Sequence, residues 1–256
     1  MPAPNLTERD ALARAGLLDV VSYEVGLDLT GDGGAPGSEG FRSTTVVRFR
    51  CRRPGEQTFV DLVADRVRSV VLNGAALDAG GYDPAEGIAL EGLAADNELR
   101  VEADCAFTNT GEGLHRFVDP VDGEVYLYSQ FETADAKRMY ACFDQPDLKA
   151  TFTLTVTAPG HWEVVSNARV ASVEPMGPAK VVRFGPTPPL STYVTALVAG
   201  PYHKVTAAHD GIDLGLYCRR TLAEHLDPEA LFEVTRQGFD WYHDNFGYRY
   251  PFDKYD

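Results

Sequence analysis

The sequence lacks most of the short motifs by which enzyme active sites are recognised. It contains no H-E-x-x-H pair, no G-x-S-x-G elbow, no Walker loop and no G-x-G-x-x-G. The six histidines are scattered, and His225 and His243 are well separated. Zinc helices, serine-hydrolase elbows and phosphate loops need those residues at those spacings. We therefore expect neither a metal site nor a complete set of catalytic residues within this chain.

Cysteine is scarce, and its spacing excludes cysteine-based scaffolds. The four cysteines lie far apart and form no C-x-x-C pair: Cys51, Cys105, Cys142 and Cys218. A zinc ribbon needs cysteines paired closely in sequence, and 256 residues can bury a core without disulfides. We expect reduced, mostly buried thiols in a cytoplasmic protein.

Basic residues are outnumbered, and long apolar runs are absent. Lys and Arg total 23 against 38 Asp and Glu, a formal net charge of −15. Nucleic-acid binding needs clustered basic residues, and the one such cluster, 48–53, alternates as one solvated face of a strand. No run of about 18 apolar residues exists, and the first 16 residues contain no apolar core of a secretory signal. We expect neither a nucleic-acid nor a membrane partner.

What the sequence does contain is a long series of strand signals. Alternating or β-branched segments recur at short intervals, with turn residues such as Pro54-Gly55 and Asn73-Gly74 between them. The segments predicted as strands are 23–29, 41–51, 58–62, 67–72, 87–90, 98–107, 125–131, 151–158, 162–166, 181–184, 192–198 and 214–218. This pattern predicts a mainly β protein, either a sandwich or a large open sheet, preceded by a short helix over 8–15.

The texture changes after about residue 202. Asp227 and Pro228 predict a helix N-terminus, because Asp is a good N-cap and Pro is tolerated at the first helical position. An apolar stripe follows: Leu231, Val234, Phe239 and Tyr242. The aromatic end of the chain is predicted as turns. We expect a domain boundary here, with residues 1–204 in one domain and 205–256 in a second domain whose helix lacks a partner layer.

The stretch 124–146 combines a strand pattern with an unusual sequel. Val125, Leu127 and Phe131 have one parity, whereas Tyr126, Tyr128, Gln130 and Glu132 have the other, so one face suits a core and the other is polar. That polar face fits an ordinary half-exposed strand. It also fits a binding site, because the segment after it has no Gly or Pro until Phe143-Asp-Gln-Pro146 and is ordered and non-repetitive.

Motifs spread over this region resemble a known family. They are Gly113-Leu-His-Arg-Phe117, Asp119-Pro120, Asp122-Gly123, Tyr126-Leu-Tyr-Ser-Gln-Phe-Glu132, Ala134-Asp-Ala-Lys-Arg138 and Cys142-Phe-Asp-Gln-Pro-Asp-Leu-Lys-Ala-Thr-Phe152. Together they closely resemble the M1 family of zinc aminopeptidases, the aminopeptidase N type. The flanking strands and the ending Phe246-Gly-Tyr-Arg-Tyr-Pro-Phe-Asp-Lys-Tyr-Asp256 fit as well. The richness in Ala, Asp and Arg is similar to that of actinobacterial members.

The resemblance implies an architecture and a cofactor. It implies a saddle-shaped β-sheet domain over about the first 200 residues, followed by the start of an α/β thermolysin-like catalytic domain. In the family, a G-x-M-E-N loop and the H-E-x-x-H zinc helix lie further along the chain. We therefore expect zinc in the full-length parent, with no zinc ligand and no peptidase activity in these 256 residues alone.

The resemblance also implies roles for two residues. In the family, the Gln and Glu of a Q-x-E motif reach from the β domain into the active site, and the match places them on Gln130 and Glu132. Glu132 is expected to bind the free α-ammonium of a peptide substrate, and Gln130 to line the pocket for its first side chain. A relative that hydrolyses a lipid epoxide has Gln at the position of Glu132, so Glu favours aminopeptidase activity. The implied partners are peptides with a free N-terminus and the remainder of the catalytic domain.

Two non-catalytic interpretations remain beside this one. The chain could come from an inactive family member that serves as a scaffold or interaction protein, although the presence of both Gln130 and Glu132 argues against it. It could also be an unrelated β-sandwich binding module, against which the length of the motif match argues. Downstream sequence with or without H-E-x-x-H separates the enzyme from the scaffold.

Overall fold

The computed structural model describes residues 6–256, so the first five residues of the segment examined for a signal sequence lie outside it. The chain divides into two compact units. The first unit comprises residues 1–117 and 127–199, and the second comprises residues 118–126 and 200–256. Each unit is described by itself below.

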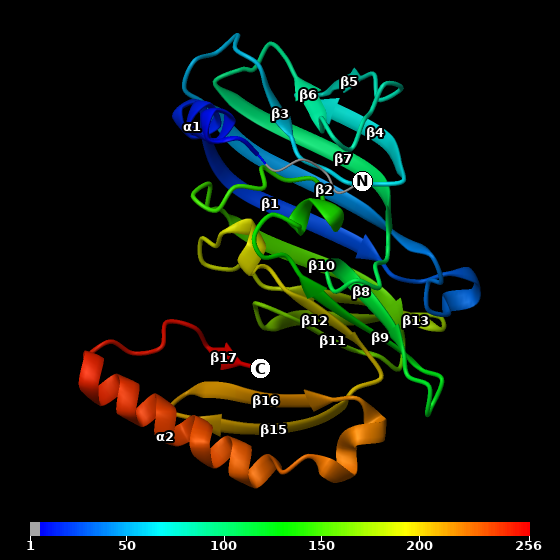
Figure 1. The fold of residues 1–256 in the computed structure, drawn as a ribbon, viewed down its shortest axis with the longest axis vertical. Helices are drawn as coiled ribbons and strands as arrows, with labels where there is room; N and C mark the ends of the chain where they lie inside the picture. Colours follow the sequence, from blue (N-terminus) through cyan, green and yellow to red (C-terminus); the bar gives the residue numbers. More distant parts are fainter. Residues whose placement is uncertain (1–5) are drawn as a thin grey trace. The chain divides into compact units, whose positions relative to one another are not determined.

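The first unit is built on an eight-stranded sheet (Figure 1). Its strands run in the order β12-β13-β10-β1-β2-β7-β4-β5. Their bounds are β1 Leu18–Asp28, β2 Gly40–Cys51, β4 Arg66–Leu72, β5 Ala75–Leu77, β7 Asp96–Ala106, β10 Thr151–Pro159, β12 Val170–Met176 and β13 Ala179–Phe184. The sheet is antiparallel except at its centre, where β1 and β10 pair in parallel from Ser22↔Thr151 to Asp28↔Thr157.

Smaller elements complete this unit. A four-stranded sheet has the order β11-β14-β9-β8, and a separate ladder joins β3 to β6. The bounds are β3 Thr58–Val60, β6 Ile88–Leu90, β8 Gly113–Val118, β9 Val125–Gln130, β11 Glu163–Ser166 and β14 Leu197–Gly200, with helix α1 Glu8–Leu17 and 3-10 turns η1 Asp32–Gly34, η2 Ala136–Arg138 and η3 Thr192–Val194. The mainly β prediction is confirmed.

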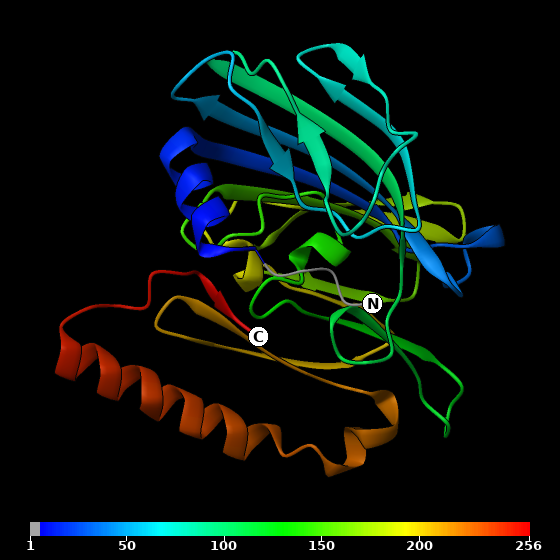
Figure 2. The same ribbon diagram turned by 45° about the horizontal axis from the view of Figure 1, so that its top comes forward.

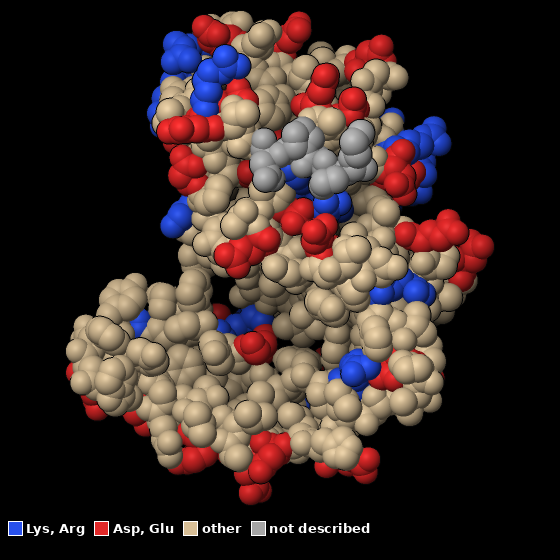
Figure 3. Space-filling model, in the orientation of Figure 1, with Lys and Arg blue, Asp and Glu red and all other residues tan. Residues whose placement is uncertain are grey.

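Strand β2 shows how the alternating sequence produces the core. Val47, Phe49 and Cys51 are buried, whereas Arg48 and Arg50 between them are exposed. Because successive side chains of a strand point to opposite faces, this alternation fixes which face meets the core. The exposed arginines form ion pairs with carboxylates on neighbouring strands, so this basic cluster is a solvated, charge-balanced face. On the face drawn in Figure 3, Lys and Arg form no continuous patch.

Local capping and turn chemistry support these elements. The hydroxyl of Thr7 accepts a hydrogen bond from the Asp10 amide at 3.2 Å and caps α1. Asn73 and Gly74 both have positive φ angles, 53° and 82°, between β4 and β5. Those angles match the tight hairpin turn for which Asn-Gly is the preferred pair.

The second unit is a three-stranded sheet with one long helix. Its sheet has the order β15-β16-β17, and the bounds are β15 His203–His209, β16 Ile212–Cys218, β17 Lys254–Tyr255, η4 Arg220–His225 and α2 Pro228–Phe246. Asp227 caps α2 by accepting from the Ala230 amide at 3.1 Å, and Gly247 ends the helix with φ 60°. Figures 1 and 2 both show α2 alongside the β15–β16 hairpin.

The predicted stripe of α2 is wrong in part. Phe232, absent from the prediction, is the buried residue of the helix, and Phe239 packs beside it on Ile212 and Leu214. Leu231, Val234 and Tyr242 are instead exposed. The helix does have a partner layer, contrary to the prediction. That layer is the β15–β16 hairpin, which precedes α2 in the sequence. The predicted turns at the chain end include β17, which pairs in parallel with β16.

Other predictions need correction. Residues 192–198 are not one strand: η3 and β14 divide them, because the Val194 and Thr195 amides bond back to Ser191 and Thr192 in a tight turn. Strands β8, β12 and β15 were not predicted, since their alternation is weak.

Cys51, Cys105 and Cys142 are buried and Cys218 half-buried, and all four are free thiols. Across residues 6–256, helices that combine the length and apolarity needed to cross a membrane are absent.

Candidate functional site

Strand β9 separates a core face from an exposed face, as its alternation predicts. Val125 and Leu127 are buried, as is Phe131 immediately after the strand. On the other face, Tyr128 is 40% exposed and Gln130 is exposed. Tyr126 departs from this pattern, because it is buried against Tyr202 of its own unit. The polar face is therefore exposed only from Tyr128 onward.

Gln130 and Glu132 lie together at the end of β9, and both are exposed. The Glu132 amide donates to Gln130 Oε1 at 2.9 Å, which orients the side-chain amide of Gln130. The peptide bond between Glu132 and Thr133 is cis. Among residues 6–256, the Glu132 carboxylate has neither an ion-pair partner nor a hydrogen-bond partner. An unpaired exposed carboxylate beside an oriented amide can accept hydrogen bonds from a cation.

An aromatic pair borders this face. His115 on β8 stacks on Tyr128 with ring centroids 4.7 Å apart and planes at 25°. The Gly111 amide donates to His115 Nδ1 at 3.0 Å, so the other ring nitrogen carries the proton in the neutral imidazole. The stack fixes Tyr128, two residues before Gln130 on the same strand face.

The segment after Glu132 is tied to its surroundings by the half-buried side chain of Arg138. Arg138 pairs with Asp135 at 2.7 Å and with Glu112 at 3.3 Å. Arg138 also packs under Gly113, where an added Cβ would lie 2.9 Å from the Cβ of Arg138 and where φ is +64°. Only glycine fits both the space and the backbone angle there. The start of β8 and the segment after Glu132 are thus packed as one piece.

A buried polar network underlies the same segment. The Asp144 carboxylate accepts from the Thr192 hydroxyl at 2.7 Å and from the Lys137 amide at 3.1 Å. The Asp144 amide donates to Asp61 Oδ2 at 2.9 Å, and Arg14 Nη1 donates to that same oxygen at 2.6 Å. Burial is the main cause that raises the pKa of Asp144 from 3.8 to about 6.

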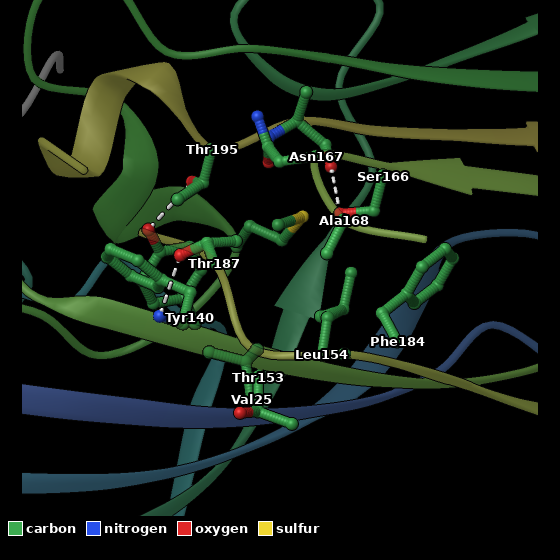
Figure 4. A pocket seen from close by; sticks show the side chains of 14 residues that line it. Val25, Tyr140, Thr153, Leu154, Ser166, Asn167, Ala168, Phe184, Thr187 and Thr195 are labelled. Carbon is green, nitrogen blue, oxygen red and sulfur yellow. Dashed lines mark hydrogen bonds between the residues drawn. The ribbon is translucent and has the colours of Figure 1, made fainter. Parts of the chain in front are cut away.

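The other groups near this network are not reactive. Burial raises the pKa of the Cys142 thiol well above its ordinary value, so the thiolate that a nucleophile needs is disfavoured. Burial likewise raises the pKa of Tyr140. The Tyr140 hydroxyl lies 2.8 Å from Thr195 Oγ1 (Figure 4). The Thr195 hydroxyl donates to the Thr192 carbonyl at 2.7 Å. These groups have a structural rather than a catalytic environment.

Two hollows of the first unit contain neither Gln130 nor Glu132. One, of about 20 Å³, lies beside Tyr140 among mostly apolar side chains (Figure 4), and it has room for one water at most. The other, of about 490 Å³, lies between α1 and the β3–β6 ladder. Its lining carries charges of both signs from Asp10, Arg53, Glu56 and Glu91. The predicted site residues lie outside both hollows.

The donor set of this chain does not fit a zinc ion. Among residues 6–256, three His, Cys, Asp or Glu side chains nowhere come together as a possible metal site. His209 is 2.7 Å from Asp240, and His243 is 3.2 Å from Asp210, each a pair without a third donor.

Sequence reasoning missed the network of Arg14, Asp61 and Asp144. A weak signal existed, because Arg14 interrupts an apolar helix face and Asp144 lies in an otherwise apolar run before Pro146. A buried charge must be paired, so each is a candidate for a buried partner. Which residues would pair could not be found, because Arg14 and Gln145, 3.1 Å apart at Nε and Oε1, are far apart in sequence.

Comparison with known proteins finds a family model and several relatives that match this part of the chain. A family model described as the peptidase M1 N-terminal domain matches residues 89–194, which include Gln130 and Glu132. An aminopeptidase N from Streptomyces lividans is 55% identical over the whole chain, which spans 30% of that relative's length. An aminopeptidase N from Acetobacter pasteurianus is 40% identical over 51% of the chain, which covers 36% of that relative.

A plant protein extends the same comparison. Aminopeptidase M1 from Arabidopsis thaliana is 33% identical over 57% of the chain, which covers 17% of that relative. The resemblance predicted from the motifs is confirmed, and the Streptomyces relative agrees with the actinobacterial composition. The chain thus spans about a third or less of the length of these relatives.

Proposed function

We propose that the chain is the N-terminal part of a zinc-dependent aminopeptidase, because residues 89–194 match a family model of the peptidase M1 N-terminal domain. In this proposal, residues 1–204 form the β domain and 205–256 begin the catalytic domain. The full-length enzyme removes N-terminal residues from peptides in the cytoplasm. The four free thiols suit that compartment, and the relatives' names as aminopeptidases support the reaction.

The single observation that carries the proposal is the state of Glu132. Its carboxylate is exposed and unpaired, on backbone that a buried network holds in place. We propose that it binds the α-ammonium of the substrate. A charge-assisted hydrogen bond to the carboxylate offsets part of the cost of removing that ammonium from water. An exopeptidase needs such a contact, because the charged amine is what distinguishes a chain end from an internal peptide bond.

Gln130 has a different role in this proposal. Its Oε1 is engaged by the Glu132 amide, so its NH₂ group is the part that faces a ligand. We assign it to the pocket for the first side chain of the substrate. Holding the amine and the first residue together fixes the next peptide bond in one place, and such positioning lowers the entropic part of a barrier.

The metal lies outside what these residues can provide. In the family, zinc activates a water molecule and polarises the peptide carbonyl. Residues 6–256 do not fit it, so we propose that its ligands belong to the remainder of the catalytic domain. The part of this chain is to bind and orient the substrate.

Substitution of Glu132 by Gln tests the proposal in the full-length enzyme. The swap keeps the shape and one acceptor oxygen but removes the charge opposite the ammonium. A hydrogen bond to a charged group contributes about 1.5–3 kcal/mol, which is a loss of roughly ten- to a hundred-fold in kcat/KM. Steady-state kinetics on several aminoacyl substrates measures this, with a melting curve for each variant.

Two further variants sharpen that experiment. Glu86→Gln, at an exposed loop position, is the matched control and should leave kcat/KM unchanged. Gln130→Ala should change the preference among first side chains more than it reduces overall activity. An unchanged kcat/KM in folded, zinc-loaded Glu132→Gln enzyme would remove Glu132 from the active site.

A further inference from the structure

We propose that Asp144 is a positioning residue for Glu132, which it controls by holding the backbone of residues 133–138. This inference rests on the proposed function, since it concerns how the proposed ammonium-binding carboxylate is kept in place. Asp144 itself is buried, so it is proposed to act through the backbone and not by contact with the substrate.

Glu132 has no side-chain anchor of its own. Its carboxylate is unpaired among residues 6–256, and its amide bonds only to the neighbouring Gln130 side chain. Its position therefore depends on the backbone on either side. On the N-terminal side, β9 is paired to β14 through Val198↔Tyr128. On the C-terminal side there is no strand, and the chain enters the short turn η2.

Turn η2 is fixed at the backbone of Lys137 by two hydrogen bonds to different parts of the fold. The Lys137 amide donates to Asp144 Oδ2 at 3.1 Å, and the Lys137 carbonyl accepts from the Val63 amide at 2.7 Å. The Asp135 amide bonds back to the Phe131 carbonyl at 3.0 Å. Lys137 is thus the first residue after Glu132 that is fixed to another part of the fold. Asp144 supplies the side-chain half of that fixation.

Asp144 is itself immobile. Its second oxygen accepts from the Thr192 hydroxyl at 2.7 Å, and its amide donates to Asp61 Oδ2 at 2.9 Å. Arg14, 2% exposed, neutralises Asp61 and reaches Gln145 as well. In a site this dry, water cannot replace a lost partner, so a missing acceptor leaves the Lys137 amide unsatisfied. The network therefore holds η2 in a fixed position. Because Glu132 lies five residues before Lys137, the same contact limits where Glu132 can lie.

The geometry predicts opposite results for two substitutions. Asp144→Ala removes both acceptor oxygens, so η2 loses the side-chain half of its fixation and keeps the Val63 bond to the Lys137 carbonyl. Asp144→Asn keeps one oxygen for the Lys137 amide, and its NH₂ group can donate to Thr192 Oγ1 once that hydroxyl rotates. Asn should therefore recover most of what Ala loses. A displacement of about 1 Å at a binding group can cost a hundred-fold in rate, so Asp144→Ala should lower kcat/KM by roughly ten- to a hundred-fold.

The test uses the full-length enzyme and a double-mutant cycle. We expect Asp144→Ala to raise KM for free-amine substrates and, because the scissile bond is then less well positioned, to lower kcat as well. Glu132→Gln should change the two constants in the same direction. Combining the two should give no further loss beyond Glu132→Gln, because both act on one contact. Multiplying losses, or an unchanged KM in Asp144→Ala, would overturn the proposal. Val47→Ala, a buried truncation in β2, controls for general loss of stability and should leave KM unchanged.

Amide hydrogen exchange of residues 133–138 measures how firmly this segment is held, independently of enzyme activity. Faster exchange in Asp144→Ala with normal exchange in Asp144→Asn supports it, and unchanged exchange in Asp144→Ala overturns it. If Glu132→Gln has no kinetic effect while exchange is faster in Asp144→Ala, the proposed function fails and the fixation stands. Should Asp144→Ala not fold, Thr192→Val removes one donor to the same carboxylate and should raise KM roughly two- to ten-fold.

Discussion

The two units of the chain bury their aromatic side chains to very different extents. The first unit encloses Tyr23, Phe49 and Trp162 almost completely and has room for a buried charged network. In the second unit, the core against which α2 packs has three buried residues, Ile212, Leu214 and Phe232. Several of its large side chains stay exposed: Val234 67%, Trp241 56%, Tyr242 57%, Phe246 67% and Tyr248 69%.

This contrast shows that a well-formed helix need not have enough buried apolar surface around it to be stable. Helix α2 is well capped and long, yet it buries only its Phe232–Phe239 side. The exposed apolar side chains on the other side of α2 form a surface that is typical of an interface. The first unit should thus be the more stable part of the chain, and the second unit the part whose stability depends on what covers it.

The largest expected effect is a core truncation in the first unit. Phe49→Ala in β2 should lower its free energy of unfolding by about 3–5 kcal/mol, because a large cavity remains in a densely packed sheet. Phe232→Ala should affect the second unit alone. The two tryptophans allow separate measurement, since Trp162 reports the first unit and Trp241 the second. Denaturation of Trp241→Phe and Trp162→Phe backgrounds gives each transition, and coincident transitions with equal shifts would refute the contrast.

A pH titration tests the charged network of the first unit. The pKa of Asp144 is raised to about 6, so the folded state disfavours its charged form. Its contribution to the unfolding free energy is therefore largest below about pH 4 and declines as pH rises to about 6. The decline is about 3 kcal/mol from the pKa difference. Relative to Asp144→Asn, the wild-type protein should lose that much stability between pH 4 and 6.5, and parallel curves would contradict it.

A smaller effect is expected at the α2 cap. Asp227→Ala removes the acceptor for the Ala230 amide and should cost about 1 kcal/mol. Amide exchange should show lower protection throughout α2, with β1 and β2 unchanged, because the two units open independently. Loss of protection in both units would mean that they unfold as one.

The smallest effect concerns the exposed side of α2. Val234→Lys should change stability by no more than about ±0.5 kcal/mol, because this side chain packs on little in the described part of the chain. It should nevertheless reduce self-association of the 256-residue chain in sedimentation experiments. The matched variant Phe239→Lys, on the packed side, should destabilise the second unit clearly.

Local rules predicted much of the fold. The alternation of β2, the Asn73-Gly74 turn and the Asp227 cap each depend on residues adjacent in sequence, and each is found as predicted. Predictions failed where a distant partner decides. Tyr126 is buried because Tyr202 lies against it, and the buried side of α2 is chosen by β15 and β16. Alternation and helical period alone contain no information about such partners.

The candidate site shows the same division. The resemblance supplied Gln130 and Glu132 as candidates, and alternation correctly put Gln130 on the exposed face. Their support could not be predicted, because Asp144 bonds to Thr192 and Asp61, each at least 48 residues away. Hydrogen bonds between side chains so far apart leave no periodic trace in the sequence.

The parallel pairing of β1 with β10 has a consequence for synthesis on the ribosome. β2 begins 12 residues after the end of β1, but the other edge of β1 pairs only with β10, about 130 residues later. At roughly 5–20 residues per second, that edge stays open for about 6 to 26 s in each nascent chain. An unpaired strand edge is a template for wrong pairing. The middle of the finished sheet is thus, during translation, its most vulnerable border.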